Sequence, residues 1–107
     1  MNVRADLPWS EQFRLAAKAW VELDKAANML EESKSAVLAQ RIAAQGDIAY
    51  NRAEMAVKAS PEWQDYIKSM VDARSGANLK KVQMEYLRMK FTEWNSDEAN
   101  KRSEKKL

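Results

Sequence analysis

Apolar residues recur at the spacing of an α-helix from Trp9 to the middle of the chain, and again from Trp63 to Trp94. In the first half they form two series that step by seven, which are Phe13, Trp20, Ala27 and Ala16, Leu23, Leu30. This step, with acids and lysines between, is typical of a helix that packs one face against another helix. With only two Gly and two Pro in 107 residues and no cluster of β-branched residues, we expect no strand.

Proline and glycine set the expected boundaries of the first half. Residues 1–8 form an irregular lead-in, because Pro8 suits the first turn of a helix. A helix is predicted over about 9–45, which is roughly 36 residues or about 54 Å long. Gly46 favours a turn there, with an uninterrupted helix as the alternative. A short helix is predicted over 47–59.

The second half begins at the clearest punctuation in the chain. Ser60 is a good N-cap, and Pro61 needs no amide donor in the first helical turn. A long helix is therefore predicted over 61–95, within which Ser75-Gly76 could cause a kink or allow a close approach of another helix. Residues 96–107 are expected to continue as exposed helix or to fray.

These elements predict an all-α fold with a single domain over residues 1–107. The simplest architecture is a long antiparallel helical hairpin or bundle. So few layers leave apolar surface uncovered, and we expect two or more copies to pack together and complete the fold.

Histidine and cysteine are both absent. Zinc sites of the usual kind and Cys-His or Ser-His nucleophiles therefore cannot form. The carboxylates of the predicted helices lie among lysines on polar faces, which disfavours an acid–base pair. We expect no enzymatic activity, no catalytic residue, no metal site and no cofactor; a hard cation bound by carboxylates is the alternative left open.

Positive charge is concentrated in one segment, although the net charge of the chain is only +2. Residues 66–90 carry six Lys or Arg against two Asp or Glu. Arg74, Lys81 and Arg88 lie seven residues apart and share one face of the predicted helix. Such a row can follow phosphates with little sequence preference. The alternative is a solvated face with local ion pairs, for example between Lys81 and Glu85.

Two further residues complete the candidate nucleic-acid interface. Lys68 lies close to the row in sequence, and Tyr86 is the aromatic residue best placed to stack on a base. The predicted nucleic-acid-binding residues are Lys68, Arg74, Lys81, Arg88 and Tyr86. Most other aromatic residues coincide with the apolar faces, where packing is the expected role.

The segment Tyr-x-x-x-Glu-Met, formed by Tyr50, Glu54 and Met55, stands between the two long predicted helices. The second of these helices carries basic and aromatic residues. Over roughly residues 25–105 this layout resembles the UvsY-type recombination mediators of phages. The resemblance implies a helical homo-oligomer that binds single-stranded DNA. It also implies a role in loading a recombinase onto strands covered by single-strand-binding protein.

The expected function is therefore that of a phage recombination accessory that binds single-stranded DNA nonspecifically as a homo-oligomer. A recombinase or a single-strand-binding protein would be its further partner. The alternative is a phage-encoded protein–protein adaptor, or an inhibitor of a host nuclease or defence complex. No apolar run approaches the ~18 residues of a membrane span, and residues 1–12 lack the apolar core of a signal peptide. We expect a location in the host cytoplasm without membrane contact.

Overall fold

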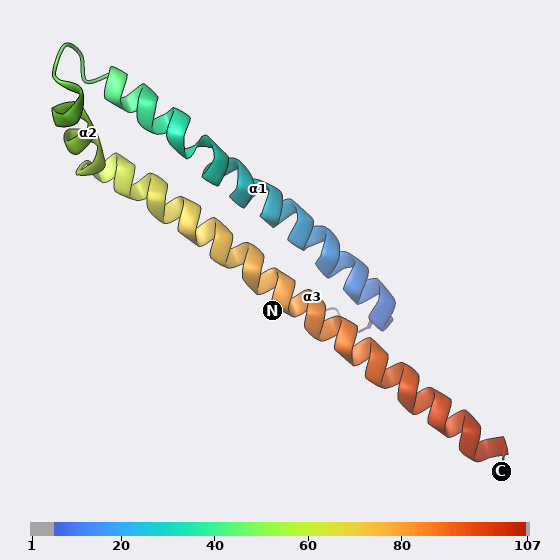
Figure 1. Cartoon of the computed structure of the whole chain (residues 1–107). Coiled ribbons are helices and arrows are strands. Elements are labelled where there is room, and N and C mark those ends of the chain that lie inside the picture. The colour runs from blue at the N-terminus through green and yellow to red at the C-terminus, as the bar shows by residue number, and fades with distance from the viewer. Residues whose placement is uncertain (1–5, 107) are drawn as a thin grey trace.

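The computed structural model describes residues 6–106 and is all-helical over them, which confirms the predicted fold class. Its helices are α1 (Trp9–Ala43), α2 (Tyr50–Lys58) and α3 (Pro61–Lys106). The long helices α1 and α3 lie side by side and antiparallel, and α2 sits at the turn between them (Figure 1). The structure measures 84 × 21 × 16 Å with a radius of gyration of 22.9 Å. A compact domain of this length would have a radius of gyration of about 13 Å. The chain is thus an elongated hairpin.

The turn of the hairpin is built around Gly46. Helix α1 ends at Ala43, slightly before the expected position near Gln45, and Gly46 follows with a φ of +89°. This left-handed conformation is open to glycine at little cost, so the chain turns here and the uninterrupted helix is excluded. Residues 47–49 remain in the loop, and α2 begins at Tyr50 rather than at Asp47.

Ser60 joins α2 to α3 with a single side chain. Its hydroxyl donates to the carbonyl of Val57 at 2.6 Å and accepts the amide of Trp63 at 3.2 Å. The second contact is that of an N-cap, as the sequence predicts for a serine before Pro61. The side chain of Gln64 adds a hydrogen bond to the carbonyl of Lys58 at 2.9 Å, which occupies one of the free carbonyls at the end of α2.

The best-formed core lies at this closed end. Its buried members are Ile42, Ala53, Val57 and Trp63. The ring of Trp63 stacks on Tyr66 with 5.5 Å between centroids, and the Tyr66 hydroxyl donates to the carbonyl of Leu30. Further along the hairpin the buried apolar residues are Ala16, Ala27, Ala77 and Leu87. The core is therefore a narrow line between two helices, and small residues at its middle leave little depth.

Helix α3 is longer than its partner. Phe91 and Trp94 lie beside Trp9 at the start of α1, and the helix continues beyond them to Lys106. Figure 1 shows this end of α3 projecting past α1. Of the two forms expected for residues 96–107, exposed helix or frayed chain, the structure has helix as far as Lys106. Leu107 and residues 1–5 of the predicted lead-in lie outside the described residues.

The two glycines are expected to respond oppositely to substitution by alanine. Helix α3 runs continuously through Gly76, and a Cβ at Gly76 would meet no heavy atom within 4 Å. Gly76→Ala should therefore raise the free energy of unfolding by about 1 kcal/mol through helix propensity. Gly46→Ala should lower it by about 1–2 kcal/mol, because its φ is +89°.

Urea denaturation followed by circular dichroism measures both changes. A Gly76→Ala variant that unfolds at lower urea than the parent would contradict the open surroundings of this position.

Candidate functional site

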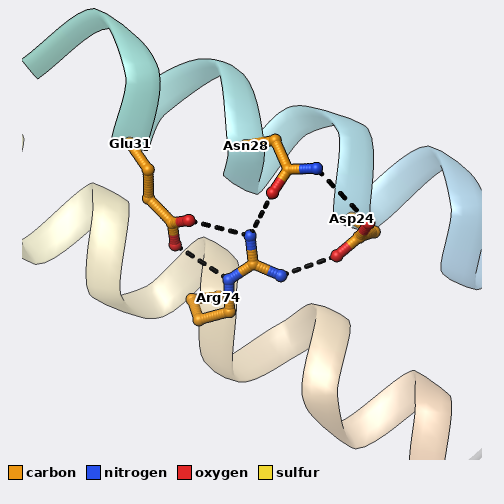
Figure 2. A network of polar contacts seen from close by, with 4 residues as sticks. All are labelled: Asp24, Asn28, Glu31 and Arg74. Carbon is orange, nitrogen blue, oxygen red and sulfur yellow. Dashed lines mark hydrogen bonds and ion pairs between the residues drawn. The ribbon is translucent and has the colours of Figure 1, made fainter.

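Arg74 of α3 binds three side chains of α1 (Figure 2). Its guanidinium donates to Asp24 Oδ1 at 2.6 Å, to Asn28 Oδ1 at 2.6 Å and to both carboxylate oxygens of Glu31 at 2.8 and 2.9 Å. Asp24, Asn28 and Glu31 follow one another at spacings of four and three, so they stand on one face of α1. We call this group of four residues the Arg74 clamp.

The electrostatics of the Arg74 clamp favour the charged form of both partners. The hydrogen bond from Arg74 is the main cause that lowers the pKa of Glu31, and the same contact raises the pKa of Arg74. Bidentate pairing of this kind fixes the geometry as well as the charge. With its side chain only 29% exposed and its donors engaged, Arg74 holds α1 against α3 in one register.

Lys81 and Arg88 lie on the same face of α3 as Arg74 but have different surroundings. The Lys81 ammonium is 5.8 Å from the centroid of the Trp20 ring on α1. Neither Lys81 nor Arg88 forms a salt bridge with a carboxylate among residues 6–106, and the alternative pair between Lys81 and Glu85 is not formed there. Two cations of the predicted row thus have no carboxylate partner among residues 6–106, and one of them, Lys81, lies against an aromatic ring.

Lys68 and Tyr86 are not part of this face. Lys68 is exposed and pairs with Asp72 at 2.8 Å, and the Asp72 carboxylate raises the pKa of Lys68. Tyr86 lies about 160° around the helix from Arg88, because two residues advance a helix by roughly 200°. Its ring is half exposed and has the Lys90 ammonium at 5.7 Å. The five predicted residues therefore do not form one site.

Tyr86 instead belongs to an apolar row on the side of α3 that faces away from α1. We call this row the outer stripe; its members are Leu79, Val82, Tyr86 and Met89, with exposures of 62%, 61%, 48% and 60%. The sequence contains the signal for it, which is the spacing of three, four and three residues. Sequence reasoning missed it because the stronger inner face of the same helix accounts for most apolar residues.

An apolar pocket of about 580 Å³ opens at the other end of the hairpin, where α1 begins. It is lined by Leu7, Pro8, Trp9, Ser10, Gln12, Phe91 and Trp94. Phe91 and Trp94 stack with 6.3 Å between their centroids, and the Gln12 side chain donates to the Leu7 carbonyl at 2.7 Å. Sequence alone places these aromatic residues on apolar faces, and only the register of the helices brings them together.

No protein-family model matches the chain, and neither a curated protein nor a solved structure matches it. Among residues 6–106 no group of three or more acidic side chains is arranged to hold a metal ion. None of the helices in this part of the chain is long and apolar enough to cross a membrane. The function is therefore argued from the surfaces described above.

Acidification is expected to lower the melting temperature through the carboxylates that accept hydrogen bonds from cations. The pKa values of Glu11, Glu31 and Glu54 lie below their usual 4.5 in the folded chain. A lowered pKa stabilises the fold above the unfolded-state pKa, and this contribution is lost as the pH falls through the folded-state pKa. Arg74→Ala removes the hydrogen bond that lowers the pKa of Glu31. The melting temperature of this variant should therefore be lower than that of the parent chain at neutral pH, and it should fall by less on acidification.

Thermal melts between about pH 7 and pH 3 measure this difference, since the carboxylates titrate in that window. Arg52→Ala is the matched control, because Arg52 is exposed on α2 and outside the Arg74 clamp. An acid profile of Arg74→Ala that runs parallel to that of the parent chain would refute the assigned role of Glu31.

Proposed function

We propose that this chain is a non-catalytic accessory protein that binds single-stranded DNA without sequence preference and acts as a homo-oligomer. The observation that supports DNA binding most directly is the pair Lys81 and Arg88. Both cations lie on one face of α3 and lack a carboxylate partner among residues 6–106. A role in phage recombination rests on the resemblance of the Tyr50–Met55 layout to UvsY-type mediators.

The spacing of the two cations suits a phosphate backbone. Seven residues of helix separate their Cα atoms by about 10.5 Å. Two long, flexible side chains at this separation can reach two phosphates of one extended strand. Binding phosphates there releases counterions, which favours association at low salt. The ring of Trp20, against which Lys81 lies, offers a face on which a base can stack. Trp20 therefore takes the stacking role that sequence analysis assigned to Tyr86.

The other predicted contacts have a smaller part in this proposal. Arg74 is occupied by the Arg74 clamp, so its charge is offset within the chain. The exposed pair between Lys68 and Asp72 contributes little to stability and can open, but Lys68 lies on another side of the helix.

A second candidate function is that of a protein–protein adaptor. The observation that favours it is the apolar pocket between Trp9, Phe91 and Trp94, which has the size and lining to receive an apolar side chain of a partner. Trp94 remains 48% exposed at its edge, and exposed tryptophan is enriched at sites where proteins bind one another.

Titration of a labelled thymidine oligonucleotide against salt tests DNA binding. For single strands the slope of log K against log salt falls by about 0.7 for each phosphate contact removed. Lys81→Ala and Arg88→Ala should each reduce the slope by about this amount and together by about 1.4. Arg52→Ala should leave the slope unchanged. Absence of binding at low salt, or a slope that is the same in the double variant, would overturn the proposal.

Capture from a nuclease-treated lysate tests the adaptor function. A stoichiometric protein that is retained by the parent chain and lost with Trp94→Ala is expected if the pocket holds a partner. Retention that is equal with both chains would assign the contact to another surface.

A further inference from the structure

Helix α3 carries two apolar faces, and only one of them is covered within the chain. The inner face packs along α1 and includes Trp63, Met70, Ala77, Met84 and Phe91. The outer stripe lies on the opposite side of the helix and stays in solvent. Its spacing of three, four and three residues is that of the apolar seam between two helices of a coiled coil. The outer stripe therefore has the pattern of a second helix–helix contact.

We propose that the outer stripe is the contact surface for a second copy of this chain, with the two α3 helices parallel and in register. This inference rests on the homo-oligomer part of the proposed function and is independent of DNA binding. A second copy offers an equal stripe, so Leu79, Val82, Tyr86 and Met89 each meet their own counterpart. No apolar member of the stripe is then left opposite a polar residue.

The flanking charges select the parallel orientation. In a parallel pair, a residue beside the seam faces the partner residue five positions further on. Glu85 then faces the partner's Lys90, and this contact occurs twice by symmetry. The Lys90 ammonium is already directed towards this side of α3, 5.7 Å from the Tyr86 ring and 3.4 Å from the Glu93 carboxylate. The salt bridges of the described residues leave Glu85 uncompensated.

The antiparallel alternative leaves a like-charge pair that no salt bridge of the described residues offsets. An antiparallel pair that buries the whole outer stripe must set Leu79 against the partner's Met89 and Val82 against the partner's Tyr86. Glu85 then lies opposite the partner's Glu85 at the two-fold axis, where two carboxylates repel each other. Shifting this pairing by one heptad avoids the repulsion but leaves apolar members of the stripe opposite polar residues.

The seam becomes polar towards the projecting end of α3. The same spacing continues through Glu93, Ser96, Asn100 and Ser103. In the parallel pair Glu93 meets the partner's Glu93, and the Lys90 ammonium, 3.4 Å from the Glu93 carboxylate in each chain, offsets this repulsion. An asparagine within such a seam favours one register and two strands at a cost in stability. The apolar part spans only about two heptads, so the contact is small and a concentration-dependent dimer of micromolar affinity is expected. In this dimer the projecting ends of the two α3 helices lie side by side.

Sedimentation equilibrium over about 1–100 µM protein, chosen to span that affinity, tests the contact without any nucleic acid. The mass should rise from 12.3 kDa towards twice that value. Val82→Glu should weaken the dimer more than tenfold. Val21→Glu is the matched control, because Val21 is 55% exposed but lies on α1 rather than on α3. Circular dichroism verifies that both variants remain helical.

A mass that stays at 12.3 kDa throughout, or an equal effect of the two glutamates, would overturn the contact surface. Because no oligonucleotide is present, this failure is distinct from a failure of the DNA titration.

Cross-linking tests the orientation, since the chain has no cysteine of its own. Asn100→Cys should form a disulfide between two copies in the parallel dimer. In the antiparallel arrangement described above, the two Asn100 positions are about 48 Å apart and cannot be bridged. Glu98→Cys, on the opposite side of the projecting helix, is the control and should cross-link at least tenfold more slowly. Equal rates at the two positions, or no disulfide at Asn100 in a dimeric sample, would overturn the parallel orientation.

Discussion

Two helices that pack against each other cover only one side of each helix, and this limit determines which surfaces of the molecule are buried and which are exposed. The line of contact between α1 and α3 is narrow, and residues as small as Ala27 and Ala77 are fully buried along it. Because so little apolar surface is buried there, packing alone defines the register of α1 against α3 only weakly. The Arg74 clamp supplies the missing definition, because its guanidinium matches three side chains of α1 at once (Figure 2). The faces turned away from the contact remain in solvent and are free for other molecules.

The fold could be read from the sequence because its determinants are local. Periodicity marks the long helices, Ser60 caps α3 through its own hydroxyl, and Gly46 allows the left-handed turn. The beginning of α2 was missed by three residues because nothing within 47–49 separates helix from loop. They belong to the connection 44–49 between α1 and α2, and the length of that connection depends on how the two helices pack.

The candidate surfaces were predictable only in part, for a different physical reason. Spacing within α3 correctly places Arg74, Lys81 and Arg88 on one face. Which of these cations meets a carboxylate depends on α1, whose partner residues lie 43 to 50 positions away in sequence. The same dependence hides the pocket of Trp9, Phe91 and Trp94. The outer stripe differs from the pocket, because its spacing is a local pattern that is visible in the sequence. The stronger apolar pattern of the inner face masks it.

The part of α3 that projects beyond Trp94 has a consequence for how the chain opens. Beyond Trp94, α3 continues to Lys106. An isolated helix shorter than about 12–15 residues is marginal in water, because nucleation of a helix costs free energy. Amide protons there should exchange with solvent at the lowest opening free energy, and protection should increase along α3 towards the cluster around Trp63. The hairpin therefore has a gradient of local stability along its length. A molecule that docks at the projecting end would steepen or flatten this gradient without changing the fold.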